Sequence, residues 1–538
     1  MANHYPDLVF LFLLTKTDCM NQVAATKGHP KGLYVLFATE MWERFNFYGM
    51  RAILVLFMTK ALLFDDVFSS NLYGSYISLI YLTPLLGGYI ADRYWGNKRS
   101  ILVGGVLMIM GELILFACGT VYKSSPELSG ILFYSGLGFM VAGNGFFKPN
   151  ISSLVGQLYK ANDTRKDSAY TIFYMGINIG GMVGPLICGF FGDTGNPADF
   201  RWAFLVGAIA MLISIVVQKL YHDKYVLTPE GKTLGLTPGK DHSAEGVSNE
   251  QKKTLVAPPP KIALNPVFMI VGMLAFAGIM IGAMYLDTKI NYLFYLLAGS
   301  FLFIIFIIFS DKNLTKEEKQ RIWVMIIIAF FVIFFWGAYE QTGASLTLFA
   351  DRQTDRELWT GYTMPTSYFQ SFNSAFIIIF APIFAWFWLK LGNKQPSTVS
   401  KMGFGLILLA FGYLWIAWGV NNVATKVSII WLTGMYLLHT WGELCLSPIG
   451  LSLFNKLSPL RFASLLMAVW FLGNAGGNKL AGVLSALYPE GGKTTSFLGY
   501  QMNNLHDFFM LFVFMGGIAG LLLLLLSKKL QKMMHGII

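Results

Sequence analysis

The sequence has few charged residues and few cysteines for its length. Asp, Glu, Lys and Arg make up only 13% of its 538 residues, whereas 55% are hydrophobic, and the mean hydropathy is +0.55. This composition excludes an ordinary water-soluble globular protein and predicts an all-α polytopic membrane protein. The 4 cysteines are widely separated and three lie in apolar segments, so they indicate neither a disulfide framework nor a metal site.

The groupings that enzymes use are also missing from the sequence. No Ser/His/Asp set, metal-ligand cluster or nucleotide-binding loop occurs among the polar residues of the apolar segments. Neither an enzyme nor a bound cofactor is therefore expected. The net charge of +11 does not indicate a nucleic-acid-binding protein, because the basic residues occupy short breaks between apolar runs and form no single patch.

Fourteen apolar segments are long enough to cross a bilayer, which takes about 20 residues each. They lie near residues 33–59, 70–91, 100–122, 130–155, 168–192, 202–219, 263–286, 289–310, 322–349, 366–391, 402–420, 427–455, 461–487 and 505–527. Lys and Arg crowd the breaks after the second, fourth, tenth and twelfth segments and the region after the last one. By the positive-inside rule, those breaks and both termini are expected to be cytoplasmic.

Three polar stretches lie outside these segments. Residues 220–262 contain Pro258-Pro259-Pro260 and too little apolar surface to fold alone, so they are expected to form a mobile cytoplasmic linker. Residues 1–32 are expected to be an N-terminal extension, within which Met20 is a candidate translation start. Residues 528–538 are expected to be a cytoplasmic tail.

Landmarks of the first half of the chain recur in the second half. The matched pairs are Trp42 with Trp336, Gly49 with Gly343, Pro84 with Pro382, Gly143 with Gly442, Pro149 with Pro448 and Asn178 with Asn474. Their spacings of 294 to 299 residues are too uniform for a chance match. Two six-helix bundles, 33–219 and 322–527, are therefore expected to flank an inserted helix pair, 263–310. This is the architecture of the major facilitator superfamily.

One stretch, Glu40 to Gly49, carries three charges inside an apolar segment. On a helix, its charged side chains share a face with Tyr48 and Arg51. Three charges facing lipid would cost roughly 8–10 kcal/mol, so this face must be wet or paired. The alternative is an interfacial or buried helix whose Glu and Arg side chains simply neutralise each other.

The other ionisable groups expected inside spans are Lys148, Glu340 and Glu443, all within the repeats. The inserted pair carries no clear intramembrane charge and is therefore expected to be a peripheral scaffold. The repeat sets Lys148 on one half opposite Glu443 on the other, which suits a zwitterion. The alternative is that Lys148 pairs with Glu40 or Glu43 to hold helices together.

Neutral polar residues are expected to accompany these charges in a central cavity. Asn178 and Asn373 offer both a donor and an acceptor, as a peptide bond requires, although each is about as well suited to bridging two helices. Trp470 is by its type more typical of core packing than of a pocket wall. The full set expected to bind substrate is Arg44, Tyr48, Tyr81, Lys148, Asn178, Asn373, Glu443, Ser447 and Trp470.

The motif Glu40-x-x-Glu43-Arg44-Phe45-x-Phe47-Tyr48-Gly49 closely resembles the E-x-x-E-R-F-x-Y-Y-G signature of the proton-dependent oligopeptide transporter family. Further matches lie at 147–150, 173–178 and 442–448, and the resemblance covers roughly 30–527. It includes the inserted helix pair expected of bacterial members. The resemblance implies a symporter of the bacterial plasma membrane that imports di- and tripeptides with the proton gradient as its energy source.

The resemblance also implies roles for individual residues. Arg44 and Lys148 are expected to meet the peptide carboxylate, Glu443 the amino terminus, and the two asparagines the peptide backbone. The expected proton-coupling residues are Glu40, Glu43, Arg44, Lys148 and Glu340. Arg51 and Glu340 resemble the pair that gates the outer side.

One residue departs from the signature, since Phe47 stands in place of the first tyrosine. A missing neutral hydrogen bond usually costs about 0.5–1.5 kcal/mol, enough to shift substrate preference without abolishing transport. Two other functions remain open from the sequence. One is import of another small anion or zwitterion such as nitrate, although the carboxylate of Glu443 would have no role in binding an anion. The other is a peptide sensor that does not transport.

Overall fold

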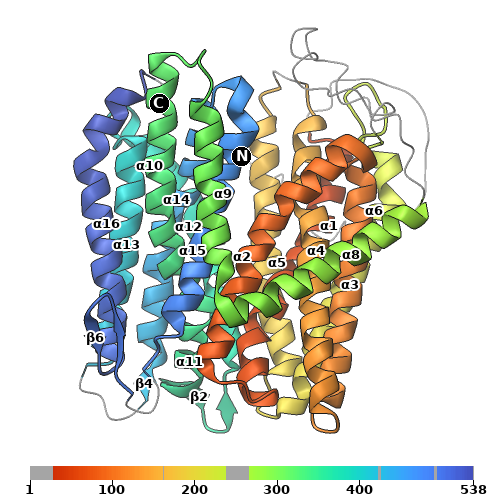
Figure 1. Ribbon diagram of the computed structural model, residues 1–538, viewed down its shortest axis with the longest axis vertical. Helices are drawn as coiled ribbons and strands as arrows, with labels where there is room; N and C mark the ends of the chain where they lie inside the picture. The colour runs from red at the N-terminus through yellow and green to blue at the C-terminus, as the bar shows by residue number, and fades with distance from the viewer. Residues whose placement is uncertain (1–27, 161–162, 238–265, 422–425, 490–492, 537–538) are drawn as a thin grey trace, which may run out of the picture.

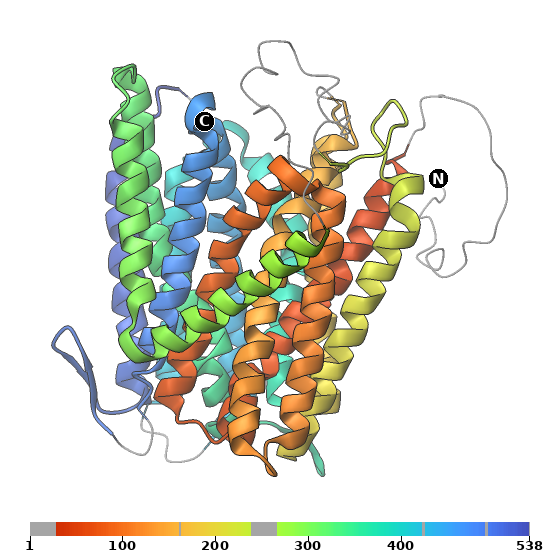
Figure 2. The same cartoon turned by 45° about the vertical axis from the view of Figure 1, so that its right-hand side comes forward.

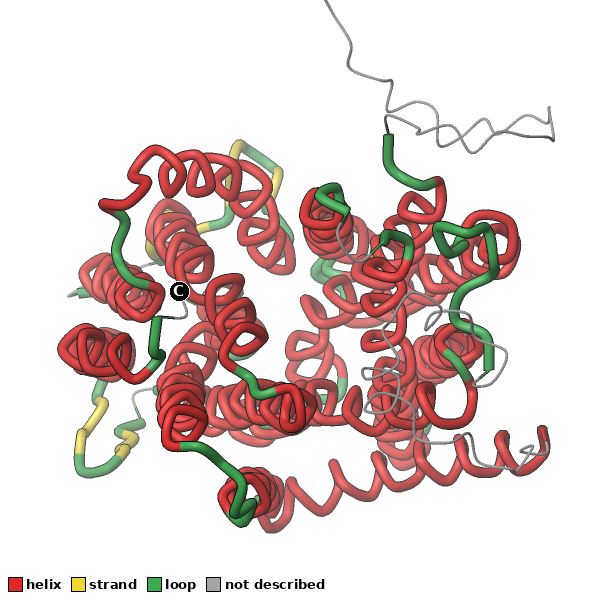
Figure 3. Tube along the Cα trace, turned by 90° about the horizontal axis from the view of Figure 1, so that it is seen from above, coloured by secondary structure: helices red, strands yellow, loops and turns green. Residues whose placement is uncertain are grey.

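The computed structural model describes residues 28–160, 163–237, 266–421, 426–489 and 493–536. Most of the predicted N-terminal extension and the second part of the predicted linker lie outside these residues. Within them, the chain forms fourteen helices of 18 or more residues, which agrees with the predicted number of spans. Two bundles stand side by side, and a helix hairpin lies against their outer surface (Figures 1 and 3).

The helices follow the order expected from the internal repeat. The N-terminal bundle contains α1 (Lys31–Leu56), α2 (Asp66–Ile90), α3 (Asn97–Val121), α4 (Pro126–Gln157), α5 (Lys166–Gly192) and α6 (Phe200–Tyr225). The inserted hairpin is α8 (Pro266–Ile290) and α9 (Tyr292–Phe309). The C-terminal bundle contains α10 (Lys316–Tyr339), α12 (Phe369–Leu391), α13 (Thr398–Gly419), α14 (Ile429–Leu457), α15 (Ala463–Ser485) and α16 (Leu505–Met533).

The two faces of the helical layer differ in their connections. We call the face where α1 begins and α16 ends the terminal face, and the opposite one the distal face. The distal face carries the short helix α11 (Ser345–Arg352) and three small two-stranded sheets. These sheets pair β1 (Thr354–Asp355) with β4 (Val427–Ser428), β2 (Glu357–Trp359) with β3 (Tyr362–Thr363), and β5 (Thr495–Phe497) with β6 (Tyr500–Met502). Figure 1 shows β2 and β4 at the lower ends of the bundles and β6 beside the lower end of α16, and Figure 2 shows the same side of the molecule at its lower edge.

Not all of the long helices are strongly apolar. Among the described residues, length, hydropathy and a low number of charges identify ten candidate spans and omit α1, α2, α14 and α15. Three of these four, α1, α2 and α15, are the helices with the most buried polar side chains; α2, for example, buries several serines and packs directly against α15. A helix that lines a cavity or an interface between bundles can be polar, because its side chains do not face lipid.

The repeat landmarks occupy equivalent helices in the two bundles. Pro84 and Pro382 both lie inside the second helix of their bundle, α2 and α12. Pro149 and Pro448 both lie inside the fourth, α4 and α14. Proline inside a membrane helix is tolerated where neighbouring helices satisfy the freed backbone groups, so its recurrence at matched positions supports a duplicated bundle.

The observed helices depart from the predicted segments at three places. The segment predicted near 322–349 breaks at Tyr339 into a 3-10 turn, Glu340–Gly343. In this turn Gly343 passes so close to Tyr73 of α2 that a Cβ there would lie 1.7 Å from the tyrosine hydroxyl, so only glycine fits. Helix α6 continues to Tyr225. Helix α16 continues to Met533, into the predicted tail.

The first part of the predicted linker is also ordered. After α6, the chain folds back on the terminal face, where the Lys98 amide donates to the carbonyl of Gly235 (2.9 Å) and His222 Nε2 bonds the carbonyl of Leu234 (3.0 Å). Val226 and Leu234 are fully buried there. The expectation that the whole of 220–262 lacks structure is therefore wrong for its first part, because these two apolar side chains dock against the bundle.

Glycines permit close helix crossings within the N-terminal bundle. A Cβ on Gly87 of α2 would lie 1.9 Å from the carbonyl oxygen of Gly145 on α4. A Cβ on the adjacent Gly88 would lie 3.6 Å from Pro149, which is ordinary contact. Membrane helices depend on such small residues because lipid provides little hydrophobic drive for association.

We expect Gly87→Ala to destabilise the protein and Gly88→Ala to leave its stability nearly unchanged. Overpacking of this kind costs about 1–3 kcal/mol, since the backbone at Gly145 cannot move away without shifting α4. The thermal denaturation midpoint of the purified protein in detergent should fall for the first variant only. Equal midpoints for both variants would contradict the crossing geometry.

Candidate functional site

The charged stretch of α1 is buried and paired within itself. Arg44 Nε lies 2.8 Å from Glu40 Oε1 and 2.6 Å from Glu43 Oε2, and no more than 3% of any of the three residues is exposed. The three charges therefore avoid lipid by pairing. The pairing leaves donors over, because Arg44 Nη2 has no hydrogen-bond partner among the described residues.

Helix α4 brings two further groups to this cluster. Asn144 Nδ2 donates to Glu43 Oε1 at 3.1 Å, and Lys148 lies one turn further along the same helix. The ammonium of Lys148 lies 4.2 Å from the centre of the Tyr81 ring of α2, a cation–π contact. It forms no ion pair with any carboxylate in the described part of the chain, so pairing of Lys148 with Glu40 or Glu43 is not present in this conformation.

Phe47 lies next to Arg44, where the resembling signature has tyrosine. Its ring is 2% exposed, and the guanidinium carbon of Arg44 lies 5.5 Å from the ring centre. The ring also packs edge-to-face on Tyr48, at 5.1 Å between centres. The aromatic contact with the cation is thus kept, and only the hydroxyl group is lost.

The C-terminal bundle supplies a carboxylate of its own. Glu443 Oε2 on α14 accepts a hydrogen bond from the hydroxyl of Tyr339 (2.5 Å) and another from Asn373 Nδ2 (3.0 Å). Asn373 also donates to Thr440 at 3.1 Å. Both partners of Glu443 are neutral, and it forms no ion pair with a cation of the described residues.

Arg51 connects the two bundles on the distal side of this cluster. Its Nη2 forms an ion pair with Glu340 and donates to Thr342 Oγ1 at 3.0 Å, while its Nε donates to the hydroxyl of Tyr73 at 2.6 Å. Two more ion pairs join the bundles nearer the distal face, Lys60 with Asp351 and Arg352 with Asp66. Within the described residues, the junction between the bundles is therefore closed on the distal side.

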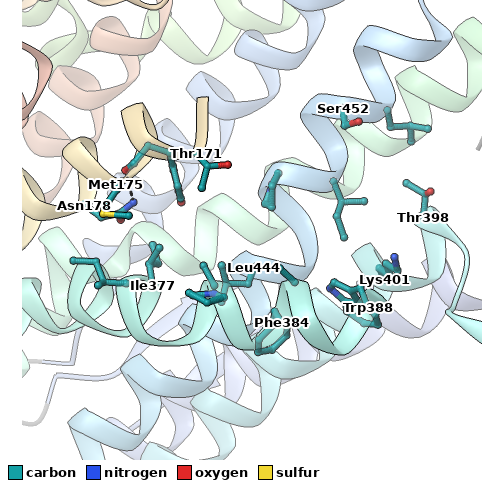
Figure 4. Close-up of a pocket in the computed structure, with 18 of the residues that line it drawn as sticks. Thr171, Met175, Asn178, Ile377, Phe384, Trp388, Thr398, Lys401, Leu444 and Ser452 are labelled. Atoms are coloured by element: carbon teal, nitrogen blue, oxygen red, sulfur yellow. Dashed lines mark hydrogen bonds between the residues drawn. The ribbon is translucent and has the colours of Figure 1, made fainter. Parts of the chain in front are cut away.

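A cavity of about 650 Å³ lies between the bundles on the terminal side of the junction (Figure 4). Helix α5 contributes Tyr174 and Asn178, and α12 and α14 form the opposite wall, while Lys401 and Trp388 lie at the far end. The Asn178 side chain donates to the carbonyl of Tyr174 at 2.9 Å, one turn back on its own helix. Of the residues expected to bind substrate, only Asn178 lines this cavity.

Three other residues expected to bind substrate also lie outside this cavity. Trp470 is 5% exposed and packs between α14 and α15, with its ring centre 5.1 Å from that of Phe454 and against Gly450. This is the core packing that its residue type favours. Ser447 is half-buried on α14, one turn beyond Glu443, and Tyr48 lies between Arg44 and Arg51 on α1, its ring centre 6.0 Å from the guanidinium of Arg51.

Several partners of the site were not expected from the sequence. They are the groups that bond the charged side chains: Tyr73, Asn144, Tyr339 and Thr342. Tyr339 and Thr342 stand beside Glu340 in the chain, and Asn144 is one turn before Lys148, so proximity to a predicted charge is the signal that identifies these three. Tyr73 is far in the sequence from every predicted charge and carries no such signal.

Three buried charges were also missed. Glu112 on α3 is fully buried, and its Oε1 accepts from Asn46 at 2.7 Å. Asp287 at the end of α8 forms an ion pair with Lys479 of α15. The expectation that the inserted pair carries no intramembrane charge is therefore wrong: Asp287 directly follows the predicted segment 263–286 and resembled a terminal residue, but the helix continues past it.

Comparisons with known proteins agree with this architecture. A family model described as the POT family matches residues 98–232 and 288–502. The chain is 34% identical to the peptide transporter YePEPT of Yersinia enterocolitica over 472 residues, covering 85% of this chain and 88% of that one. It is 30% identical to a di-/tripeptide transporter of Lactococcus lactis subsp. cremoris, covering 94% of this chain and 97% of the relative.

A solved structure shows the same fold. The crystal structure of the peptide transporter POT in complex with sulfate superimposes with a TM-score of 0.77 at 30% sequence identity, covering 95% of this chain and 97% of that one. The family model matches more than half of the chain, and the similarity to the relatives includes both bundles and the inserted hairpin. The chain therefore belongs to the POT family of membrane transporters.

Proposed function

We propose that this protein is a proton-coupled symporter that imports di- and tripeptides by alternating access. Its relatives in Yersinia and Lactococcus are named as peptide transporters. The observation that carries the proposal is the separation of charge between the bundles. Arg44 and Lys148 lie in the N-terminal bundle, and Glu443 lies in the C-terminal bundle. A free peptide has opposite charges at its two ends and can contact both sides.

The cationic side has donors to spare for a carboxylate. Arg44 Nη2 has no partner among the described residues, and the ammonium of Lys148 lies over the face of the Tyr81 ring and forms no ion pair in the described part of the chain. A carboxylate that accepts from both would form charge-assisted hydrogen bonds, which are about twice as strong as neutral ones. Glu443, held by two neutral donors, would receive the ammonium group at the other end of the peptide.

Proton coupling follows from competition for the same cations. Glu40 and Glu43 both pair with Arg44 at its Nε, so their negative charges offset the charge of Arg44 and weaken its attraction for a substrate carboxylate, although Nη2 remains a donor without a partner among the described residues. Protonation of either glutamate weakens that internal pairing and makes Arg44 available. Proton and peptide then favour the same state, which is coupling by linkage.

The conformation and the charge distribution suggest the direction of transport. The bundles are joined by ion pairs on the distal side, and the cavity lies on the terminal side. Most of the connections rich in Lys and Arg lie at the terminal face, which we therefore assign to the cytoplasm, with both termini, in a bacterial plasma membrane. On this assignment, the structure represents an inward-facing state and Arg51 and Glu340 form the outer gate.

We expect Glu40→Gln and Glu43→Gln to abolish proton-driven accumulation of peptide while leaving exchange of peptide down its own gradient. Neither amide can release a proton, but both keep the shape of the site. Glu112→Gln is the matched control, because Glu112 is equally buried and lies outside the cluster, bonded to Asn46. Uptake of labelled dipeptide into proteoliposomes measures both activities. Full accumulation by both cluster variants would reject the mechanism.

A dipeptide amidated at its carboxyl terminus should compete with labelled peptide roughly tenfold or more weakly than the free dipeptide. The amide carries no charge for Arg44 and Lys148, and a hydrogen bond to a charged group contributes about 1.5–3 kcal/mol. The inhibition constant of each compound in the same exchange assay gives the comparison. Equal competition would show that the carboxylate is not bound by these cations.

The assignment of the faces predicts opposite labelling of two exposed positions. Asn393, between α12 and α13, lies at the terminal face, and Leu498 is 93% exposed at the tip of the β5–β6 hairpin on the distal face. In intact cells, a membrane-impermeant maleimide should label Leu498→Cys and should label Asn393→Cys only after the cells are lysed. Both variants need Cys19→Ala, since the other three cysteines are buried. The reverse pattern would invert the orientation.

A further inference from the structure

The turn of the inserted hairpin is held by a buried ion pair. Asp287 Oδ2 pairs with Lys479 Nζ of α15, and the two residues are 0% and 1% exposed. Lys479 Nζ also donates to Asn291 Oδ1 in the turn at 3.2 Å. The other oxygen of Asp287 accepts from the backbone amide of Leu293 at 2.9 Å and so caps the first turn of α9. The turn is thus tied to the C-terminal bundle.

The same cluster also contacts the N-terminal bundle, through one hydroxyl group. Ser75 of α2 donates to Asp287 Oδ2, and Lys479 Nζ lies 3.1 Å from Ser75 Oγ. Next to it, α2 and α15 cross closely, since a Cβ on Gly74 would lie 2.6 Å from the Cα of Gly482. Ser75, Asp287 and Lys479 therefore lie where the two bundles and the hairpin all meet.

The two arms of the hairpin rest on different bundles (Figures 1 and 2). Helix α8 packs on α4, with the rings of Tyr285 and Tyr134 5.7 Å apart between centres. Helix α9 packs mainly on α15, where Leu297 forms one apolar cluster with Leu472, and Tyr81 and Leu82 of α2 pack against the edge of this cluster. When the bundles separate on the distal side, the turn cannot keep both sets of contacts.

The contacts differ greatly in the cost of breaking them. Separating Asp287 from Lys479 would leave two opposite charges unpaired in an apolar environment, and removing one partner of such a buried pair is strongly destabilising. Releasing the Ser75 hydroxyl leaves the ion pair intact. The contact between α8 and α4 consists of apolar packing, which has no fixed direction, and one neutral side-chain hydrogen bond, between Tyr134 and Thr288, which costs far less to break than a buried ion pair. The turn should therefore stay with the bundle that holds the ion pair.

We propose that the Asp287–Lys479 ion pair fastens the turn of the inserted hairpin to the C-terminal bundle. During transport the turn then moves with α15, while α8 slides across α4 and the hydrogen bond from Ser75 to Asp287 is broken. The hairpin is then a moving part of the cycle. The movement of the turn during transport rests on the proposed function, whereas the attachment of the turn to α15 does not.

Cross-linking tests the motion. In a Cys19→Ala background, a short reducible bis-methanethiosulfonate cross-linker would join Tyr134→Cys to Tyr285→Cys, or, as the matched control, Leu297→Cys to Leu472→Cys. We expect the link between α4 and α8 to abolish peptide exchange in proteoliposomes, with recovery on reduction, and the link between α9 and α15 to leave at least half of it. Retained exchange with the first link, or loss with the second, would overturn the proposal.

A double-mutant cycle of thermal denaturation midpoints tests the attachment of the turn without any measurement of transport. Asp287→Asn keeps an oxygen for the Leu293 amide but removes the charge, and Lys479→Met removes the cation. Each single variant should lower the denaturation midpoint, the double variant should recover most of the loss, and Ser75→Ala should lower it less than either. Additive losses in the double variant would overturn the proposal. If the unsubstituted protein exchanges no peptide, the proposed function fails and this cycle alone decides the attachment.

Discussion

The arrangement of this protein depends on the pairing of charges that cannot reach water. Glu40, Glu43, Arg44 and Lys148 sum to zero net charge, yet they are not matched in pairs. Both carboxylates share one guanidinium nitrogen, while the lysine contacts an aromatic ring. In a low-dielectric interior, such an imbalance makes the cluster sensitive to any group that adds or removes a charge. A proton and a carboxylate are two such groups.

The same requirement explains how the bundles are held together. On the distal side, three ion pairs between described residues join the bundles, among them Arg51 with Glu340 and Lys60 with Asp351. On the terminal side, the cavity separates α5 from α12 and α14. Within each bundle, helices cross closely at glycines, as Gly87 does with Gly145 and Gly405 does with Gly442. The directional bonds that could be exchanged between two arrangements of the bundles lie at the junction.

Much of the fold could be predicted from the sequence because its signals are local or periodic. The apolar runs gave the helix count, and the spacing of Pro84 and Pro382, or of Pro149 and Pro448, indicated the duplication. Hydropathy could not reveal that α10 ends at Tyr339. The residues after Tyr339 are enclosed by protein, so their composition does not show whether they continue the helix or form a turn.

The charged residues of the site could be predicted from the sequence, but the groups to which they bond mostly could not. Arg44, Arg51 and Glu340 are conspicuous in apolar segments, and the structure pairs them. The choice of partner depends on tertiary geometry: Glu443 meets the hydroxyl of Tyr339, and Lys148 meets the ring of Tyr81. Asp287 was missed for another reason, because a charge at the edge of an apolar run looks the same whether it faces the headgroups or a buried lysine.

The shortness of α9 has a consequence for the membrane around the protein. Its 18 residues amount to roughly 27 Å of helix, slightly less than the hydrocarbon thickness of about 30 Å in a typical bilayer. A helix of this length can just span such a bilayer, and a short span is matched by local thinning at a modest cost for each ångström of mismatch. Since α9 is the shortest of the fourteen long helices described, we expect the length of the lipid acyl chains to affect the hairpin more than either bundle.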